Sequence, residues 1–131
     1  MARMQDLALA FENVKAKVSD KDFRYLSFQL WQEGISRYTE EVAAKMATGG
    51  YNATEAFAGL EGVISYADAL GELEETRSKE MATMDPVTSK RVVFYPLGAS
   101  LGMLLDRHRP DWRGDYFESA FDLVSMVIGH K

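Results

Sequence analysis

Apolar side chains recur at the three- and four-residue spacing of an α-helix along most of this chain, and this spacing limits the fold more than any other feature. The clearest stripe lies within 20–47, and its apolar positions are Phe28, Trp31, Ile35, Tyr38, Val42 and Met46. Sustained alternation of apolar and polar residues, the pattern of a half-buried strand, does not occur, and RVVFY at 91–95 is too short to count as one. The sequence therefore predicts an all-α fold.

Cap and turn residues divide the chain into five expected helices within a single helical domain, 1–131. These helices cover about 4–18, 20–47, 52–80, 88–107 and 116–128. Ser19 is a typical N-cap, Gly49-Gly50 is a typical stop, and Asp85-Pro86 is a typical start. Pro96 is expected to kink the fourth helix, because proline removes one backbone donor.

Charge and composition exclude several classes of function. The net charge is -5 and no cluster of Lys or Arg occurs, so we expect no nucleic acid as a partner. No segment approaches the roughly 20 apolar residues of a membrane span, so we expect no membrane partner. The N-terminal stretch lacks the apolar run of a secretory signal. The absence of cysteine rules out thiolate metal ligands and thiol nucleophiles.

Two adjacent residues are out of place in the second expected helix. Gly34 lies in its interior, where glycine costs about 1 kcal/mol relative to alanine. Glu33 is a carboxylate between the apolar residues Trp31 and Ile35. Either the pair is tolerated at a surface, where Arg37 would form an i,i+4 ion pair with Glu33, or Glu33 is there to hold a ligand.

The segment 33–40 reads E-G-x-S-x-Y-x-E. It resembles the helix that supplies the third zinc ligand in the gluzincin metallopeptidases, the aminopeptidase-like zinc enzymes. The resemblance implies that Glu33 ligates zinc and that Gly34 lets the neighbouring zinc helix approach closely. The stretch 91–101 is similar to the Y-x-x-G-A-x-x-L helix of the same family. This second resemblance implies that Tyr95 stabilises the oxyanion of the tetrahedral intermediate and that Gly98-Ala99 makes a close helix contact.

The chain lacks the other half of the zinc site of this family. Gluzincins hold zinc with H-E-x-x-H, two histidines one helical turn apart, and the Glu between them acts as general base. The two histidines here, His108 and His130, both follow Glu33, and we expect the first to be solvated and the second to lie in a frayed terminus. Zinc and a peptide substrate are therefore implied for a full-length relative, whereas this chain alone is expected to bind no zinc and to be inactive.

Two explanations for the missing motif stay open. The chain is a fragment of a longer metallopeptidase, or it is a degenerate relative that lost the metal. The fragment is favoured because the segments around Glu33 and Tyr95 both look intact. If the resemblance holds, these two side chains should lie on neighbouring helices and face one cleft.

The alternative function is of a different class: a non-catalytic all-α module for protein interaction or self-association. It would use the apolar stripe from Met4 to Val18, so a homo-oligomer is expected to form through the N-terminal helix. In that case Arg37 or another cation should neutralise Glu33.

Arg91 precedes Tyr95 by one helical turn and has two interpretations. It binds a carboxylate of the substrate, or it forms an ion pair with Glu80 or Asp85. The ion pair is the favoured interpretation.

Overall fold

The computed structural model describes residues 4–129, which are helical with no strand, so the predicted all-α class is confirmed. The helices in chain order are α1 (Met4–Lys15), α2 (Asp20–Gln29), η1 (Leu30–Gly34), α3 (Ile35–Gly50), α4 (Glu55–Ala58), α5 (Tyr66–Thr83), α6 (Pro86–Ser89), η2 (Lys90–Val93), α7 (Phe94–His108), α8 (Trp112–Glu118) and α9 (Val124–Ile128). None of these helices is both long and apolar enough to cross a bilayer.

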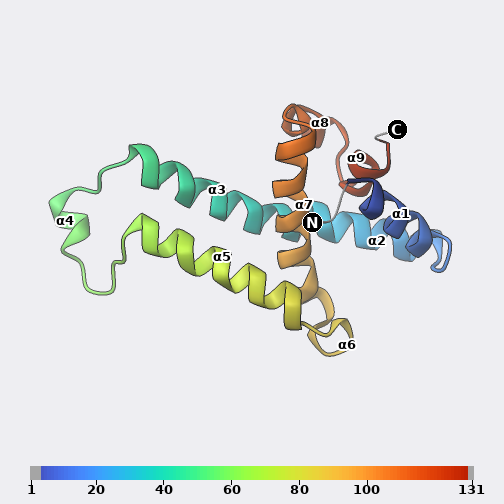
Figure 1. Ribbon diagram of the computed structural model, residues 1–131, viewed down its shortest axis with the longest axis horizontal. Coiled ribbons are helices and arrows are strands. Elements are labelled where there is room, and N and C mark those ends of the chain that lie inside the picture. Colours follow the sequence, from blue (N-terminus) through green and yellow to red (C-terminus); the bar gives the residue numbers. More distant parts are fainter. Residues whose placement is uncertain (1–3, 130–131) are drawn as a thin grey trace.

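The elements α2, η1 and α3 follow one another as a single long helix that runs through most of the molecule (Figure 1). Ser19 caps its start, because the Asp22 amide donates a hydrogen bond of 3.2 Å to the Ser19 hydroxyl. The helix ends at Gly50, as the paired glycines predicted. Within it, the residues of η1 wind as a π-helix. This form is rare in proteins, and where it occurs it often lies at a functional site.

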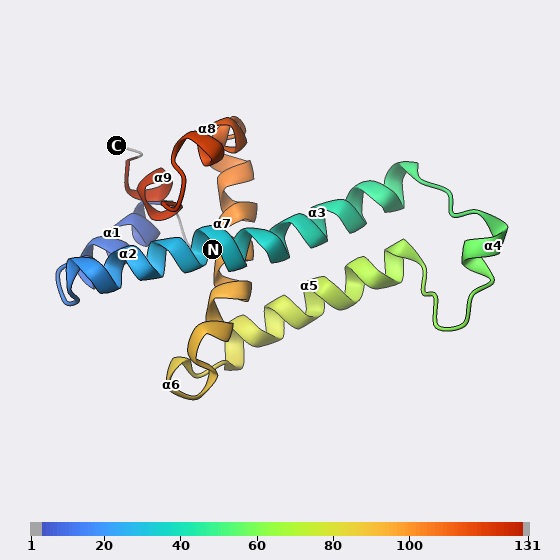
Figure 2. The same ribbon diagram turned by 180° about the vertical axis from the view of Figure 1, so that it is seen from behind.

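Helix α7 crosses this long helix at a steep angle (Figure 2). Its side chains Ala99, Leu101 and Leu105 are buried at the centre of the core. The expected helix at 88–107 instead begins at Phe94, after the 3-10 turn η2. Pro96 therefore lies in the first turn of α7, where a backbone nitrogen needs no helical partner, and the expected interior kink is wrong.

The apolar stripe of α1 is largely covered within the chain itself. Met4 and Phe11 are buried, and α1 packs against α9, whose Val124 and Val127 are fully buried. Self-association through α1 stays a prediction. The expected final helix at 116–128 is in fact two helices, α8 and α9, separated by a turn that contains Phe121 at φ 69°.

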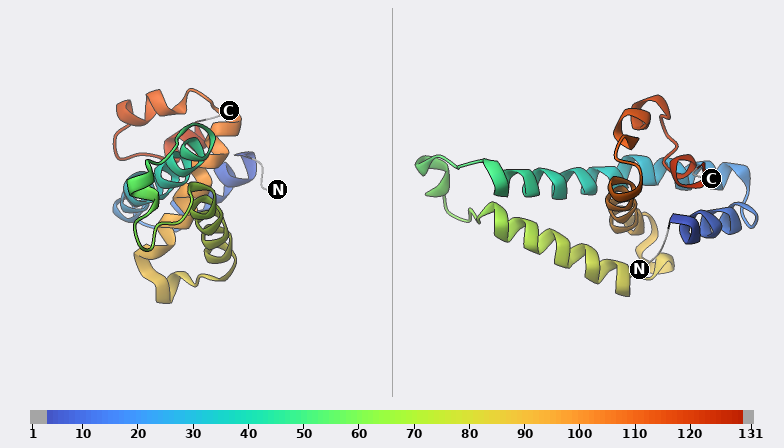
Figure 3. Two further views of the ribbon diagram at one scale, coloured as in Figure 1. Left: turned by 90° about the vertical axis from the view of Figure 1, so that its left-hand side faces the viewer. Right: turned by 45° about the horizontal axis from the view of Figure 1, so that its top comes forward.

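Helices α3 and α5 lie antiparallel and extend away from α7 as an arm, with α4 at its tip (Figure 3). The expected continuous helix at 52–80 is wrong, because α4 ends at Ala58 and α5 starts only at Tyr66. Gly62 adopts φ 80° between them, and the Ser65 side chain caps α5 by accepting the Asp68 amide.

Candidate functional site

The long helix and α7 touch backbone to backbone where Gly34 meets Gly98. A Cβ atom added to Gly34 would lie 3.0 Å from the Gly98 carbonyl carbon and closer still to the Gly98 Cα atom. A Cβ atom added to Gly98 would meet the Gly34 backbone in the same way. Neither position accepts a side chain unless the helices separate. Gly98 thus makes the close helix contact expected of it, whereas Gly34 meets α7 and not the zinc helix that the resemblance implies.

Glu33 and Tyr95 meet at the same crossing. The pKa of the Tyr95 hydroxyl is raised, and the largest cause is its hydrogen bonding to the Glu33 carboxylate. Burial and the negative charge of Glu33 raise that pKa further. Both side chains are half-buried. The two residues thus lie on neighbouring helices, as the resemblance requires, while the expected shared cleft and their chemical roles stay predictions.

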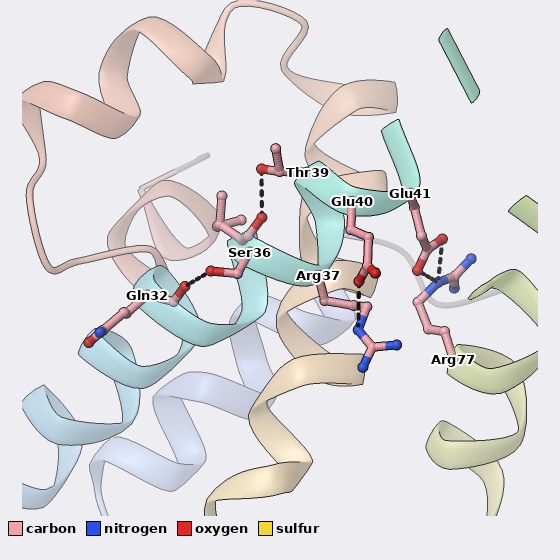
Figure 4. Close-up of polar contacts among 8 residues, drawn as sticks. Gln32, Ser36, Arg37, Thr39, Glu40, Glu41 and Arg77 are labelled. Carbon is pink, nitrogen blue, oxygen red and sulfur yellow. Dashed lines mark hydrogen bonds and ion pairs between the residues drawn. The ribbon is translucent and has the colours of Figure 1, made fainter. Parts of the chain in front are cut away.

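Two arginines act on the same hydroxyl in the opposite direction. The positive charges of Arg91 and, to a smaller extent, Arg37 lower the pKa of Tyr95. Arg37 pairs with Glu40 at 3.5 Å, so the expected ion pair with Glu33 is wrong (Figure 4).

Arg91 also differs from its favoured interpretation. It is exposed, and within residues 4–129 it forms no ion pair with Glu80 or Asp85. The expected pairing is therefore wrong, and this guanidinium is left beside the Glu33–Tyr95 contact without a carboxylate partner in the described part of the chain.

A complete zinc site is not formed by the residues that the structure describes. Over the range 4–129, no three His, Cys, Asp or Glu side chains come together as a possible metal site. His108 is exposed at the end of α7, and His130 lies outside the described residues. Because protein zinc sites use three or four side-chain ligands, the donor set of this chain does not fit zinc by itself. Glu33 fits the role of one ligand among several.

The Glu33–Tyr95 pair offers two complementary functions to a bound molecule. The carboxylate supplies an anionic oxygen that accepts hydrogen bonds or binds a cation. The phenol supplies a neutral donor, and its raised pKa keeps it protonated at neutral pH. Another anionic oxygen within reach of this hydroxyl would receive the same hydrogen bond that Glu33 receives here.

Sequence analysis missed a buried ion pair farther along α3. Glu41 is 1% exposed, and the Arg77 Nε group on α5 donates to its two carboxylate oxygens at 2.9 and 3.0 Å (Figure 4). One signal was present, because Glu41 follows Gly34 by seven residues and Tyr38 by three, which places it on the buried face. Its partner, Arg77, lies in the charged stretch 71–80, where no spacing within one helix could pair it with Glu41.

A second polar cluster joins α3, α7 and α8 around Asp106. The Tyr38 hydroxyl donates to both Asp106 oxygens at 3.0 Å, and Trp112 Nε1 donates to one of them at 2.8 Å. Arg113 completes the cluster with an ion pair of 2.8 Å to Asp106. Gly102 lies directly under the Tyr38 ring, which a Cβ atom there would meet at 2.6 Å. This cluster fixes Tyr38 in a structural position, away from the Glu33–Tyr95 pair.

Comparisons with family models, with curated proteins and with solved structures find no match for this chain. Similarity to known proteins therefore neither supports nor opposes the resemblance to the gluzincins. The roles of Glu33 and Tyr95 depend on the sequence pattern and on the contacts at the helix crossing.

Proposed function

We propose that this chain is the C-terminal helical part of a gluzincin-like zinc-dependent peptidase. Glu33 supplies the third zinc ligand, and Tyr95 donates a hydrogen bond to the oxyanion of the tetrahedral intermediate. The two histidines and the general base belong to an additional segment of a full-length relative. Zinc, when bound in that relative, polarises the peptide carbonyl and activates water. The chain is inactive without that segment.

The observation that carries the proposal is a pair of contacts between two motifs far apart in the sequence. Glu33-Gly34 and Tyr95-x-x-Gly98 were matched to the family by residue type and spacing alone. In the fold, Glu33 contacts Tyr95 and Gly34 contacts Gly98. Because Glu33 adjoins Gly34 and Tyr95 lies one helical turn before Gly98, both contacts follow once these two matched segments cross, and that crossing is what supports the proposal.

The charge on Glu33 supports the same conclusion. A non-catalytic module should neutralise this half-buried carboxylate with Arg37 or another cation. Within residues 4–129, Glu33 forms no ion pair, and Arg37 is engaged with Glu40. Among the described residues the carboxylate therefore has no cationic side chain paired with it, which leaves it available to a metal ion.

The test uses the natural gene product, with any segment that precedes residue 1 in its reading frame. We expect stoichiometric zinc, measured by elemental analysis after dialysis, and hydrolysis of internally quenched peptides. Glu33→Gln should lose the zinc, because a neutral amide is a far weaker ligand. Tyr95→Phe should keep the zinc and lower kcat by about 10²–10³-fold, the usual loss when one oxyanion donor is removed.

Two matched variants control for general effects of the substitutions. Glu72→Gln removes an exposed carboxylate on α5, and Tyr51→Phe removes an exposed hydroxyl near the arm tip. Both should leave zinc content and kcat unchanged. A natural product that contains no H-E-x-x-H segment and binds no zinc would overturn the proposal.

A second candidate is a non-catalytic interaction module, favoured by the apolar side chains that the arm exposes. Met46 is 72% exposed, and Tyr51, Leu60 and Ile64 are each about half exposed. Sedimentation velocity on the 131-residue chain tests this candidate. A dimer that Leu60→Asp dissociates, together with a natural product free of zinc, would favour the module over the peptidase.

A further inference from the structure

A groove of about 850 Å³ lies between α2 and the segment that leads into α7. Tyr25 and Leu26 form one wall, and the opposite wall ends with Phe94 and Leu97, which flank Tyr95 in the sequence. The volume is within the range of sites that bind small molecules or short peptide segments.

The groove combines an apolar lining with positive charge at one wall. Its apolar side chains include Leu26, Phe94 and Leu97, and its charged side chains are Lys90 and Arg91. None of the described residues that line it is an Asp or Glu, and neither cation has an ion-pair partner within the range 4–129. This charge distribution is complementary to an anionic occupant that also carries an apolar group.

Lys90 has an unusual backbone conformation at the edge of this groove. Its φ angle is 51° with ψ at -127°, whereas side-chain-bearing residues rarely adopt positive φ. Residues held in such conformations gather at binding and catalytic sites, because the surrounding structure must maintain them. The conformation places a cation at the junction of α6 and η2, next to Arg91.

The groove is close to the Glu33–Tyr95 pair. Leu26 precedes Glu33 by seven residues, which corresponds to about 10 Å along the helix. An extended peptide covers this distance with about three residues. A peptide residue held in the groove would therefore lie within a few residues of a bond cleaved at Glu33 and Tyr95.

We propose that this groove binds the C-terminal residue of a peptide, with its apolar side chain against Leu26, Phe94 and Leu97 and its free carboxylate on Lys90 and Arg91. A C-terminal residue carries its apolar side chain and its free carboxylate on the same Cα atom. It is therefore favoured over an internal acidic residue, because the apolar and the cationic parts of the groove adjoin each other. As a statement about hydrolysis, the inference rests on the proposed function. It names the substrates of that peptidase: peptides with a free, apolar C-terminal residue, cleaved near that end.

The test measures peptide binding to the 131-residue chain by fluorescence anisotropy, without zinc. The probe is an N-terminally labelled Gly-Gly-Ser-Gly-Leu peptide, prepared with a free C-terminal carboxylate and as the amide. We expect the acid to bind at least about tenfold more tightly, the effect of a charge-assisted hydrogen bond. Arg91→Gln should reduce this preference, with Lys90 left as the remaining cation.

Two further variants separate local effects from general ones. Val92→Asp adds a negative charge at a half-exposed position that lines the groove and should weaken binding of the acid at least about tenfold. Lys79→Gln makes the same charge change as Arg91→Gln at an exposed position on α5 and should bind like the wild type. Because Arg91, Val92 and Lys79 are all exposed, these variants are expected to fold normally.

Equal affinity for acid and amide, or a preference that Arg91→Gln leaves undiminished, would overturn the inference. If an amidated peptide ending in Glu-Leu binds as tightly as the acid, the groove recognises an acidic side chain and not the C-terminal carboxylate. That result would also overturn the inference. A carboxylate preference in a chain whose natural product lacks zinc would keep the groove inference and reject the peptidase. Zinc-dependent hydrolysis without a carboxylate preference would keep the peptidase proposal and reject the groove inference.

Discussion

Gly34 and Gly98 are in backbone contact, and this contact decides how two helices cross. Because the side chains at a contact set the distance between packed helices, two glycines permit an approach that no other pair allows. The same crossing brings Glu33 within hydrogen-bond reach of Tyr95. The glycine that weakens the interior of the long helix is therefore required by the contact on which the candidate site depends.

Gly34→Ala should lower the free energy of unfolding by about 1–2 kcal/mol. Overpacking costs roughly 1–3 kcal/mol, and about 2–3 kcal/mol applies here because the added Cβ atom meets backbone. The better helix propensity of alanine returns about 1 kcal/mol. Urea unfolding followed by circular dichroism measures the difference. Gly71→Ala is the matched control, because a Cβ atom there meets no atom within 4 Å, and it should stabilise the chain by up to about 1 kcal/mol. Equal stability of Gly34→Ala and the wild type would contradict the close crossing.

The ion pair between Glu41 and Arg77 should be sensitive to loss of one partner. Arg77→Met leaves a buried carboxylate without its cation and should cost about 3 kcal/mol in unfolding free energy, whereas the double variant Glu41→Leu/Arg77→Met should recover most of that loss. Arg37→Met is the control, because its ion pair with Glu40 is exposed and should cost less than about 1 kcal/mol. Similar losses for the two Arg variants would contradict the burial of Glu41. Guanidinium unfolding curves give these differences.

Tyr95 should ionise at a higher pH than an exposed tyrosine, and Glu33→Gln should lower its pKa towards the ordinary value. The hydrogen bond and negative charge of Glu33 both favour the neutral hydroxyl, and the substitution removes the charge. Ultraviolet titration of tyrosinate, with the signal of Tyr95→Phe subtracted, reports this group alone. Glu72→Gln should leave the curve in place, and an unchanged curve in Glu33→Gln would mean that the two side chains do not interact.

Raised tyrosine pKa values also predict how stability depends on pH. Burial raises the pKa of Tyr38 and Tyr116, and the hydrogen bond to Glu33 raises that of Tyr95. Above the unfolded-state pKa of about 10, the native chain holds more protons than the unfolded chain, so unfolding free energy falls as pH rises through the folded-state values. Thermal unfolding between neutral and alkaline pH should show a decline that begins near pH ~10. If the loss of stability is already complete well below pH ~10, groups other than these tyrosines cause it.

Backbone amides of the arm should exchange with solvent faster than those of α7. The described residues of α4 and α5 include no buried one, whereas six residues of α7 are buried. Segments with few buried contacts open at low free energy. Hydrogen–deuterium exchange with peptide-level readout should give the fastest helical exchange in 55–70 and the slowest in 96–105. Uniform protection along the chain would show that the arm opens only with the core.

Helix boundaries were predictable where a local signal decided them. Ser19 caps α2 through its own side chain, and Gly50 ends α3, so the chain within a few residues holds the needed information. The helix expected at 52–80 is interrupted around Gly59 and Gly62, although Leu60, Val63 and Ile64 keep a helical apolar spacing. Those apolar side chains are exposed, so the periodic pattern there does not mark a buried face.

The partners of charged residues were less predictable than the helices. Spacing along one helix suggested a pair between Arg37 and Glu33, but Tyr95 on another helix takes the carboxylate and Arg37 turns to Glu40. The pairing of Glu41 with Arg77 likewise joins two helices. Contacts between helices depend on the crossing geometry, which no local pattern contains.

The sequence by itself determined the all-α class, the long helix, and the residue types at Glu33, Gly34, Tyr95 and Gly98, because helical periodicity, caps and short motifs are properties of neighbouring residues. Only the tertiary structure decided that these four residues meet, that the helix at Glu33 winds as a π-helix, and that Arg91 faces a groove without a carboxylate partner among the described residues. The reason is physical: which side chains touch depends on how closely and at what angle the helices pack, and that is settled by the whole core together.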